Sequence, residues 1–404
     1  MAQVLICGAA IVTLSMGIRH GFGLWLQPIT MERGWTRETF AFALAIQNLT
    51  WGVAGLFVGM VADRFGAYRV LLAGSLIYAL GLATMAIAAT PLAFTASAGV
   101  LLGIAQAGTT YAVVYGVIGR NVDPARRSWA MGVTAAAGSF GQFLMLPVES
   151  ALISGVHWAG IASPGVGWRN ALFILAVLAL LIVPLAVGLK ERPLAASAGE
   201  QQSIVQALRE AFGYRSFQLL MAGYFVCGFQ VVFIGVHLPS YLKDHGLTPQ
   251  VATIALALIG LFNIFGTYAA GALGQHYPKR HLLSAIYILR SIAIVAFLAA
   301  PLTAASVYIF AAVMGGLWLS TVPLTNAVVA QMFGVRHFSM LSGFIFLSHQ
   351  FGSFLGAWLG GKLYDATGSY DVVWGIAVAL GVFAALINLP VRETAIHRPA
   401  MAAA

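Results

Sequence analysis

The chain consists of long apolar runs separated by short polar segments. Residues 70–119 and 291–335 contain no Asp, Glu, Lys or Arg. Because a helix needs about 20 apolar residues to cross a bilayer, each of these runs can hold two crossings and a tight turn. The runs are continuous, which excludes the alternating strands of about ten residues that build outer-membrane barrels. They predict twelve membrane spans, at residues 4–30, 39–62, 70–90, 93–117, 128–154, 168–189, 217–241, 250–275, 281–300, 304–328, 338–363 and 371–391.

One longer polar connection, residues 190–216, divides the chain in two. Within it, residues 203–210 have the pattern of a short amphipathic helix on the membrane surface. The sequence therefore predicts an all-α membrane protein with 12 transmembrane helices in two six-helix bundles. We expect an N-terminal bundle over residues 1–189, a cytoplasmic linker over 190–216, a C-terminal bundle over 217–391 and a cytoplasmic tail over 392–404.

The composition excludes a water-soluble protein. Of the 404 residues, 60% are hydrophobic and only 8% are charged, whereas soluble domains carry roughly 25% charged residues. The formal net charge is +9, but with both termini inside, fourteen of the 21 Lys and Arg residues fall in cytoplasmic segments and five outside. This is the positive-inside bias. We therefore expect cytoplasmic termini, a monomeric multi-pass protein in the lipid bilayer of the cell inner membrane, and no nucleic acid partner.

The sequence offers no motif for enzymatic or metal chemistry. The segment from Gly356 to Lys362 satisfies most of a phosphate-loop pattern, but Leu363 occupies the Ser/Thr position and the segment lies in an apolar helix rather than after a strand. No group of His, Cys, Asp and Glu has the spacing of metal ligands. We expect no enzyme activity, no cofactor and no metal.

A loop after the second span carries a recognisable motif. It reads Gly59-x-x-Ala62-Asp63-Arg64-x-Gly66-x-x-Arg69, and a degenerate copy follows the eighth span with Gln275-His276 in place of Asp63-Arg64. This pattern resembles the signature loop of the major facilitator superfamily. The resemblance implies two six-helix halves with a substrate site between them, and a cytoplasmic latch at Asp63 and Arg64. The alternative is a solvated turn.

Within that superfamily, the chain resembles the bacterial branch of the monocarboxylate transporter family. The matching stretches are Gly17-x-Arg19-x-Gly21-Phe22-Gly23, Gly138-Ser139-Phe140-Gly141-Gln142 and His349-Gln350-Phe351-Gly352. The family pattern places a cation in span 1, matched in kind by Arg19-His20, and an Asp-x-x-x-Arg pair in span 8. Asn263 and Thr267 stand in the places of that pair. This departure leaves lactate-type proton symport and the substrate open.

Arg19 is the strongest candidate for binding a substrate. An arginine within a span costs roughly 2.5–3.5 kcal/mol on insertion scales and by default marks a functional site. Its guanidinium can take a carboxylate bidentately, and the alternative is a structural ion pair with Glu149. The adjacent His20 is either a proton carrier or a neutral imidazole bonded to a neighbouring helix.

Other polar residues within spans have weaker claims. Glu149 in span 5 is either the proton-coupling carboxyl or a partner of Arg169 or water near the outer surface. His349 and Gln350 in span 11, with Gln142 as their first-half counterpart, favour a substrate or gating role over interhelical bonding. For Arg290 in span 9, we favour a role in pinning that helix to its neighbours through backbone carbonyls over a role in binding a ligand. Further candidates for the lining of a substrate cavity are Gln230, Tyr111, Tyr115, Asn326, Phe22 and Trp318.

These features together predict a secondary active transporter that moves a small organic anion, of the monocarboxylate class, by alternating access. In this interpretation Arg19 binds the anion, and His20, His349 or Glu149 carries a coupling proton. An exporter of a metabolite or drug-like compound, working as an antiporter, is the main alternative. A membrane receptor or an intramembrane enzyme is a third class, which the sequence disfavours because it lacks a large soluble domain and a catalytic constellation.

Overall fold

The computed structural model describes residues 2–122, 124–158, 161–189, 204–334 and 338–396, and most of them are helical. The helices of the first half are α1 (Ala2–His20), α2 (Phe22–Arg33), α3 (Arg37–Phe65), α4 (Ala67–Ile87), α5 (Pro91–Phe94), a π-helical segment (Thr95–Leu101), α6 (Leu102–Thr109), α7 (Tyr111–Asn121), α8 (Pro124–Ser154), α9 (Gly167–Ala179) and α10 (Ile182–Val187). The second half holds α11 (Ile204–Gly213), α12 (Arg215–Asp244), α13 (Pro249–His276), α14 (Lys279–Ala299), α15 (Ala304–Leu317), α16 (Thr321–Phe333), α17 (Phe338–Thr367) and α18 (Asp371–Asn388). Two short antiparallel strands, β1 (Val156–Trp158) and β2 (Ile161–Ser163), join α8 to α9.

The expected spans agree with these helices. Eleven helical segments of the described chain are long and apolar enough to cross a membrane. The one expected span that is not among these eleven, residues 338–363, corresponds to α17, a continuous helix that is long enough but contains the polar residues Ser348, His349 and Gln350. Its place as a crossing therefore stays a prediction. Helix α11 covers the expected amphipathic segment, with Ala207 buried and Ile204 exposed.

Four of the expected spans are broken helices rather than single ones. Span 1 divides into α1 and α2 at Gly21, and span 10 divides into α15 and α16 at residues 318–320. Spans 4 and 6 divide in the same way, the former with a π-helical segment. The hydropathy pattern could not reveal these breaks, because a break leaves the side chains on both sides apolar.

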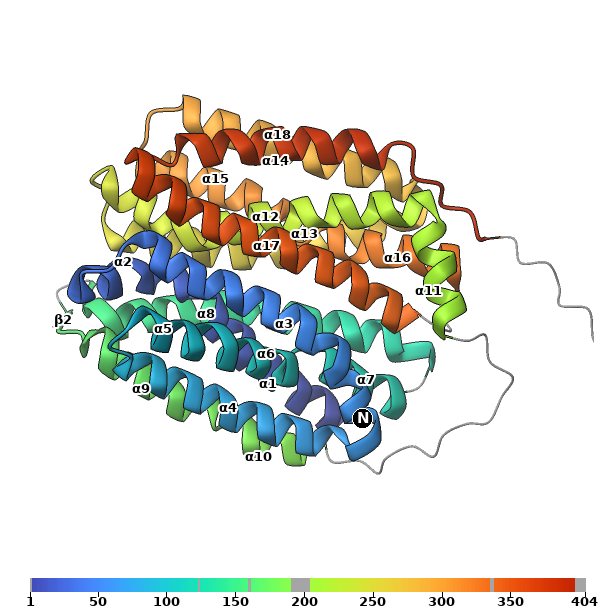
Figure 1. Cartoon of the computed structure of the whole chain (residues 1–404), viewed down its shortest axis with the longest axis horizontal. Coiled ribbons are helices and arrows are strands. Elements are labelled where there is room, and N and C mark those ends of the chain that lie inside the picture. The colour runs from blue at the N-terminus through green and yellow to red at the C-terminus, as the bar shows by residue number, and fades with distance from the viewer. Residues whose placement is uncertain (1, 123, 159–160, 190–203, 335–337, 397–404) are drawn as a thin grey trace, which may run out of the picture.

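The two halves form two groups of helices that run in the same general direction (Figure 1). The start of α1, helix α11 and the end of α18 lie at one end of the molecule, which we call the proximal end. The opposite, distal end carries the connections 34–36, 245–248 and 368–370 and the described parts of the connection between α8 and α9, residues 155–158 and 161–166. The halves meet where α3 packs on α17, α8 on α13 and α2 on α12.

Glycines allow the helices of the bundle to approach closely. A Cβ atom added to Gly352 of α17 would lie 1.8 Å from the carbonyl oxygen of Phe225 in α12. One added to Gly141 of α8 would lie 2.2 Å from the carbonyl oxygen of Thr13 in α1. Such backbone contact is the usual function of small residues between membrane helices.

We predict that Gly352→Ala lowers the thermal unfolding midpoint of the detergent-purified protein, because the added methyl group overpacks a backbone contact at a cost of about 1–3 kcal/mol. The matched control is Gly375→Ala in α18, where an added Cβ meets open space and helix propensity improves. Equal midpoints for the two variants would contradict the packing described here.

Candidate functional site

The break in span 1 places two basic side chains at the end of a helix. Helix α1 ends at His20, Gly21 follows, and the N–H of Leu24 donates to the carbonyl of Gly21 over 2.8 Å. A cation at a helix C-terminus interacts favourably with the helix dipole, so this break helps to hold Arg19 within the bundle. Gly21 is required here, because a Cβ atom would lie 1.6 Å from Glu149 Oε2.

Arg19 has only neutral partners in the part of the chain that the structure describes. Its Nη2 donates to Asn48 Oδ1 over 2.5 Å, and the guanidinium lies over the ring of Trp51, 4.7 Å from the centroid. The side chain is partly exposed. The structural ion pair with Glu149, which was the alternative interpretation, is not formed between these two described residues.

Among the described residues, only one ring nitrogen of His20 has a hydrogen-bond partner. Its Nδ1 lies 2.7 Å from the carbonyl oxygen of Met16, and since a carbonyl only accepts, Nδ1 carries the proton and donates. The other nitrogen, Nε2, therefore holds a lone pair in the neutral ring. The side chain is partly exposed, so this nitrogen can accept a hydrogen bond.

Helix α3 connects Arg19 to the second half. The ring of Trp51 packs edge-on against Phe346 of α17 at 5.2 Å, and Phe346 stacks on His349 at 5.9 Å. Gly52, next to Trp51, lies against Gln350. A Cβ atom added to Gly52 would lie 2.8 Å from the Cβ atom of Gln350. Asn48 and Gly52 are one helical turn apart on α3, about 5.4 Å along the axis.

We call the set that this arrangement brings together the central polar cluster: Arg19, His20, Asn48, Trp51, His349 and Gln350. His349 Nδ1 lies 3.1 Å from Gln350 Oε1, and the buried amide nitrogen of Gln350 has no hydrogen-bond partner among the described residues. An unsatisfied buried amide costs about 1–3 kcal/mol. The cluster therefore offers a cation and an unused N–H donor beside the interface of the two halves.

Gln142 and Asn263 join the halves outside this cluster. Gln142 Nε2 donates to the carbonyl of Leu256 in α13 over 3.1 Å. Asn263 Nδ2 donates to Ser139 Oγ over 2.9 Å, and its Oδ1 accepts from the backbone N–H of Leu319 over 3.0 Å. Both side chains are buried and use their polar atoms on protein partners.

Arg290, Gln230 and Trp318 form a separate buried group within the second half. Arg290 donates to the carbonyl of Leu317 from Nε (3.1 Å) and Nη2 (2.6 Å), to the carbonyl of Trp318, and to Gln230 Oε1 (3.4 Å). Gln230 Nε2 donates to the carbonyl of Ala377 over 2.9 Å. Arg290 thus holds the break between α15 and α16, as expected for pinning. The structure does not bring Gln230 or Trp318 to Arg19.

The remaining cavity candidates form no described hydrogen bond with the central polar cluster. Phe22 is buried in the first-half core. The rings of Tyr111 and Tyr115 pack on each other at 5.4 Å on α7, with the Tyr111 hydroxyl against Gly138. Asn326 Nδ2 donates to the carbonyl of Val322 in its own helix over 3.0 Å.

Glu149 is fully buried inside the first half. Its Oε2 accepts from Trp25 Nε1 over 2.9 Å, while Oε1 has no hydrogen-bond partner among the described residues. Arg169 pairs with Glu32 over 3.1 Å instead. The alternative that placed Glu149 near the surface, paired with Arg169 or water, is therefore wrong for this conformation.

The structure describes only part of the expected latch. Asp63 and Arg64 lie at the proximal end of α3, and Arg64 is exposed with its guanidinium 5.4 Å from the ring of Phe65. The side chain of Asp63 lies outside the described part of the structure.

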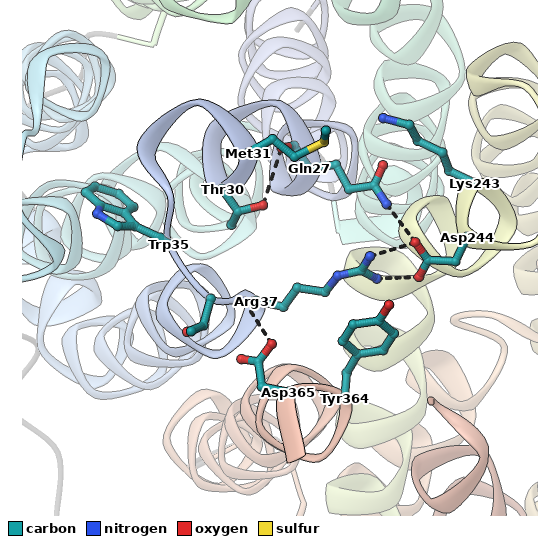
Figure 2. Close-up of a pocket in the computed structure, with 10 residues that line it drawn as sticks. Gln27, Thr30, Met31, Trp35, Arg37, Lys243, Asp244, Tyr364 and Asp365 are labelled. Carbon is teal, nitrogen blue, oxygen red and sulfur yellow. Dashed lines mark hydrogen bonds and ion pairs between the residues drawn. The ribbon is translucent and has the colours of Figure 1, made fainter. Parts of the chain in front are cut away.

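A second polar group, which the sequence did not single out, joins the halves at the distal end (Figure 2). The guanidinium of Arg37 on α3 forms two hydrogen bonds with Asp244 of α12, at 2.6 and 2.7 Å, and donates to the Tyr370 hydroxyl over 2.9 Å. Gln27 of α2 donates to the same Asp244 over 3.1 Å. Asp365 of α17 accepts from the backbone N–H groups of Arg37 and Glu38, which begin α3.

Of these residues, Gln27, Arg37, Asp244 and Asp365 line a cavity of about 450 Å³ at the distal surface. Burial raises the pKa of the Tyr370 hydroxyl above its ordinary value, so this group stays protonated and can donate as well as accept. We call Gln27, Arg37, Asp244, Asp365 and Tyr370 the distal cluster. The charged residues of the distal cluster lie at the ends of spans, where polar residues are typical of loops. The one signal in the sequence was the position of Arg37 and Asp244 at the expected ends of two spans.

Comparisons with known proteins agree with this architecture. The model of the Major Facilitator Superfamily matches residues 5–322 and, in a second match, residues 220–404. The chain is 24% identical over 388 residues to YcxA of Bacillus subtilis, described as an uncharacterised MFS-type transporter, covering 92% of this chain and 90% of that one. It is 26% identical over 344 residues to monocarboxylate transporter 13 of Bos taurus, covering 82% and 75%.

A solved structure shares the fold. It is a bacterial homologue of the human lysosomal transporter Spinster in an inward-facing, unoccupied conformation, with a TM-score of 0.76, 18% identity and coverage of 97% of this chain and 98% of that one. Because the family model covers both halves, the chain belongs to the Major Facilitator Superfamily and is a multi-pass membrane transporter.

Proposed function

We propose that this transporter moves a small organic anion of the monocarboxylate class across the cell inner membrane by alternating access, together with a proton. The observation that carries the proposal is the guanidinium of Arg19. It lies within span 1, beside the interface of the halves, and its described partners are the neutral Asn48 and Trp51. An anion would supply the missing charge, whereas a cationic cargo would add to the cost of an arginine within a span.

The rest of the central polar cluster supports a carboxylate as the ligand. A carboxylate accepts hydrogen bonds at two oxygens, and arginine can bind it bidentately. The unused N–H group of Gln350 comes from the second half, so one anion can contact both halves at once. The names of the relatives called monocarboxylate transporters fit this substrate class.

Alternating access is supported by the distribution of polar contacts between the halves. Those that the structure describes lie at the distal end, through the distal cluster and through Thr253 of α13, which donates to Ser150 of α8, and in the middle, through Gln142 and Asn263. The positive-inside bias assigns the distal end to the outside, so we interpret this conformation as closed to the outside. Asp63 and Arg64 are proposed to act at the opposite, cytoplasmic end.

A coupling proton has three candidate carriers. His20 follows Arg19 and has one ring nitrogen without a hydrogen-bond partner among the described residues, His349 lies in the same cluster, and Glu149 is a buried carboxyl next to the break in span 1. Export of a metabolite or drug-like compound uses the same architecture with the reverse coupling, and the direction of proton-driven flux in vesicles distinguishes the two.

We predict that Arg19→Ala and Arg19→Lys abolish uptake of labelled acetate, lactate, pyruvate and benzoate into proteoliposomes. Removing one partner of a desolvated charge pair costs about 2–5 kcal/mol, which weakens binding ~30-fold or more. The control is Arg169→Ala, which removes an exposed cation of the same half. Unchanged uptake by both Arg19 variants would remove Arg19 from the site and with it the proposed substrate class.

We further predict that Asp244→Asn loosens the distal end. The test uses a protein in which Cys7→Ala and Cys227→Ala remove the native thiols and Thr30→Cys introduces a single new one. Thr30 lines the distal cavity. A membrane-impermeant thiol reagent should label Cys at this position about fivefold faster, because a partly exposed ion pair contributes up to about 1 kcal/mol. Glu32→Gln, which breaks a distal ion pair within one half, serves as the control and should leave labelling unchanged. Equal rates in the two variants would show that the distal cluster does not hold the halves together.

A further inference from the structure

Glu149 is the one carboxyl side chain that is fully buried in the described part of the molecule. The carboxylates of Glu32, Asp244 and Glu393 pair with cations, and Asp365 accepts two backbone N–H groups. Glu149 instead accepts one hydrogen bond, from the indole of Trp25, and its second oxygen has no partner among the described residues. Its surroundings therefore differ from those of these four acids.

No cation among the described residues forms an ion pair with this carboxyl. The titratable groups Arg19 and His20 of α1 and Tyr78 of α4 form their described hydrogen bonds with other partners: Asn48, the carbonyl of Met16 and the carbonyl of Ser15. An ionised carboxylate that is removed from water with a single neutral donor is strongly disfavoured. This closed conformation therefore accommodates Glu149 in its neutral, protonated form.

The position of Glu149 connects it to the interface of the halves. Its Oε2 touches Gly21, where span 1 breaks, and Trp25 lies one turn into α2. The other side of α2 meets α12 of the second half, since a Cβ on Gly23 would lie 2.2 Å from the carbonyl oxygen of Gly235. Gln27 continues this contact to Asp244. Helix α2 is thus held between Glu149 and the second half.

We propose that Glu149 is the proton-binding carboxyl of this transporter, and that α2, hinged at Gly21, links its protonation to closure of the distal end. This inference rests on the proposed function and selects one of its three candidate carriers. The carboxylate takes a proton from water while the distal end is open, and the O–H bond so formed breaks again when the proton leaves to water on the other side. An ionised Glu149 would be left buried against Trp25 in the closed arrangement, so ionisation favours opening. Trp25 is a positioning residue.

The first test needs no substrate. Infrared spectra of the purified full-length protein in lipid should contain the C=O stretching band of a protonated carboxyl at neutral pH. Glu149→Gln should remove this band, and Trp25→Phe should shift it to higher frequency through loss of the indole hydrogen bond. Glu32→Gln is the matched control and should keep the band. A band that survives in Glu149→Gln, or that is absent from the wild type, would overturn the proposal.

The second test follows the distal end with pH. In the Thr30→Cys protein, we measure the rate at which the thiol reagent labels this cysteine, normalised to the rate for the same protein in denaturing detergent. This labelling rate should rise as the pH is raised. The rise should be lost in Glu149→Gln and retained in Glu32→Gln. A Glu149→Gln variant with the same rise as the wild type would refute the link between Glu149 and closure.

Transport separates this inference from the proposed function. With the labelled monocarboxylates named above, Glu149→Gln should lose accumulation driven by an imposed pH gradient but keep exchange of labelled for unlabelled anion, whereas Arg19→Ala should lose both. Gradient-driven accumulation by Glu149→Gln at the wild-type level would overturn the role of Glu149 and leave anion transport intact. Failure of the wild type to carry any of these anions would overturn the proposed function, while the infrared band would still report on Glu149.

Discussion

The central constraint on this molecule is a positive charge within a membrane span that no negative charge of the described residues matches. Arg19 is held by an amide oxygen and the face of an indole, both of which direct the guanidinium but neither of which neutralises it. Such an arrangement is costly when empty and is relieved by an anion. This one electrostatic fact underlies the proposed substrate class. It also underlies the need for a second polar contribution from α17 and the position of the cluster beside the interface.

Arg290 shows the other way in which a membrane protein can accommodate an arginine. It is fully buried, and its N–H groups are taken up by the carbonyls that the break between α15 and α16 leaves free. Both arginines lie beside broken helices. Arg290 satisfies the carbonyls at its break, whereas Arg19 remains available to bind an anion. The contrast indicates that interrupted helices serve two purposes here: they supply backbone acceptors in the second half, and in the first half they provide the bend at Gly21 against which Glu149 packs.

The sequence predicted the helices well and the contacts between them less well. Apolar runs place the spans to within a few residues, because crossing a bilayer imposes both length and composition. Pinning of span 9 by Arg290 was also predicted, whereas the partners of Arg19 were not, since Asn48 and Trp51 are ordinary members of an apolar run. The distal cluster was not foreseen at all. Arg37 and Asp244 are 207 positions apart, and nothing in the local pattern of either segment indicates that folding brings them together.

The distal cluster also has a kinetic meaning for a carrier of the proposed kind. Each 1.4 kcal/mol by which its ion pair and hydrogen bonds stabilise the closed arrangement, without equal stabilisation of the barrier, slows reopening about tenfold. A loaded carrier can offset this cost with contacts to its cargo as the halves move, but an empty one has no such help. Return of the unloaded form would then limit the turnover, and swapping one bound anion for another would outpace net flow.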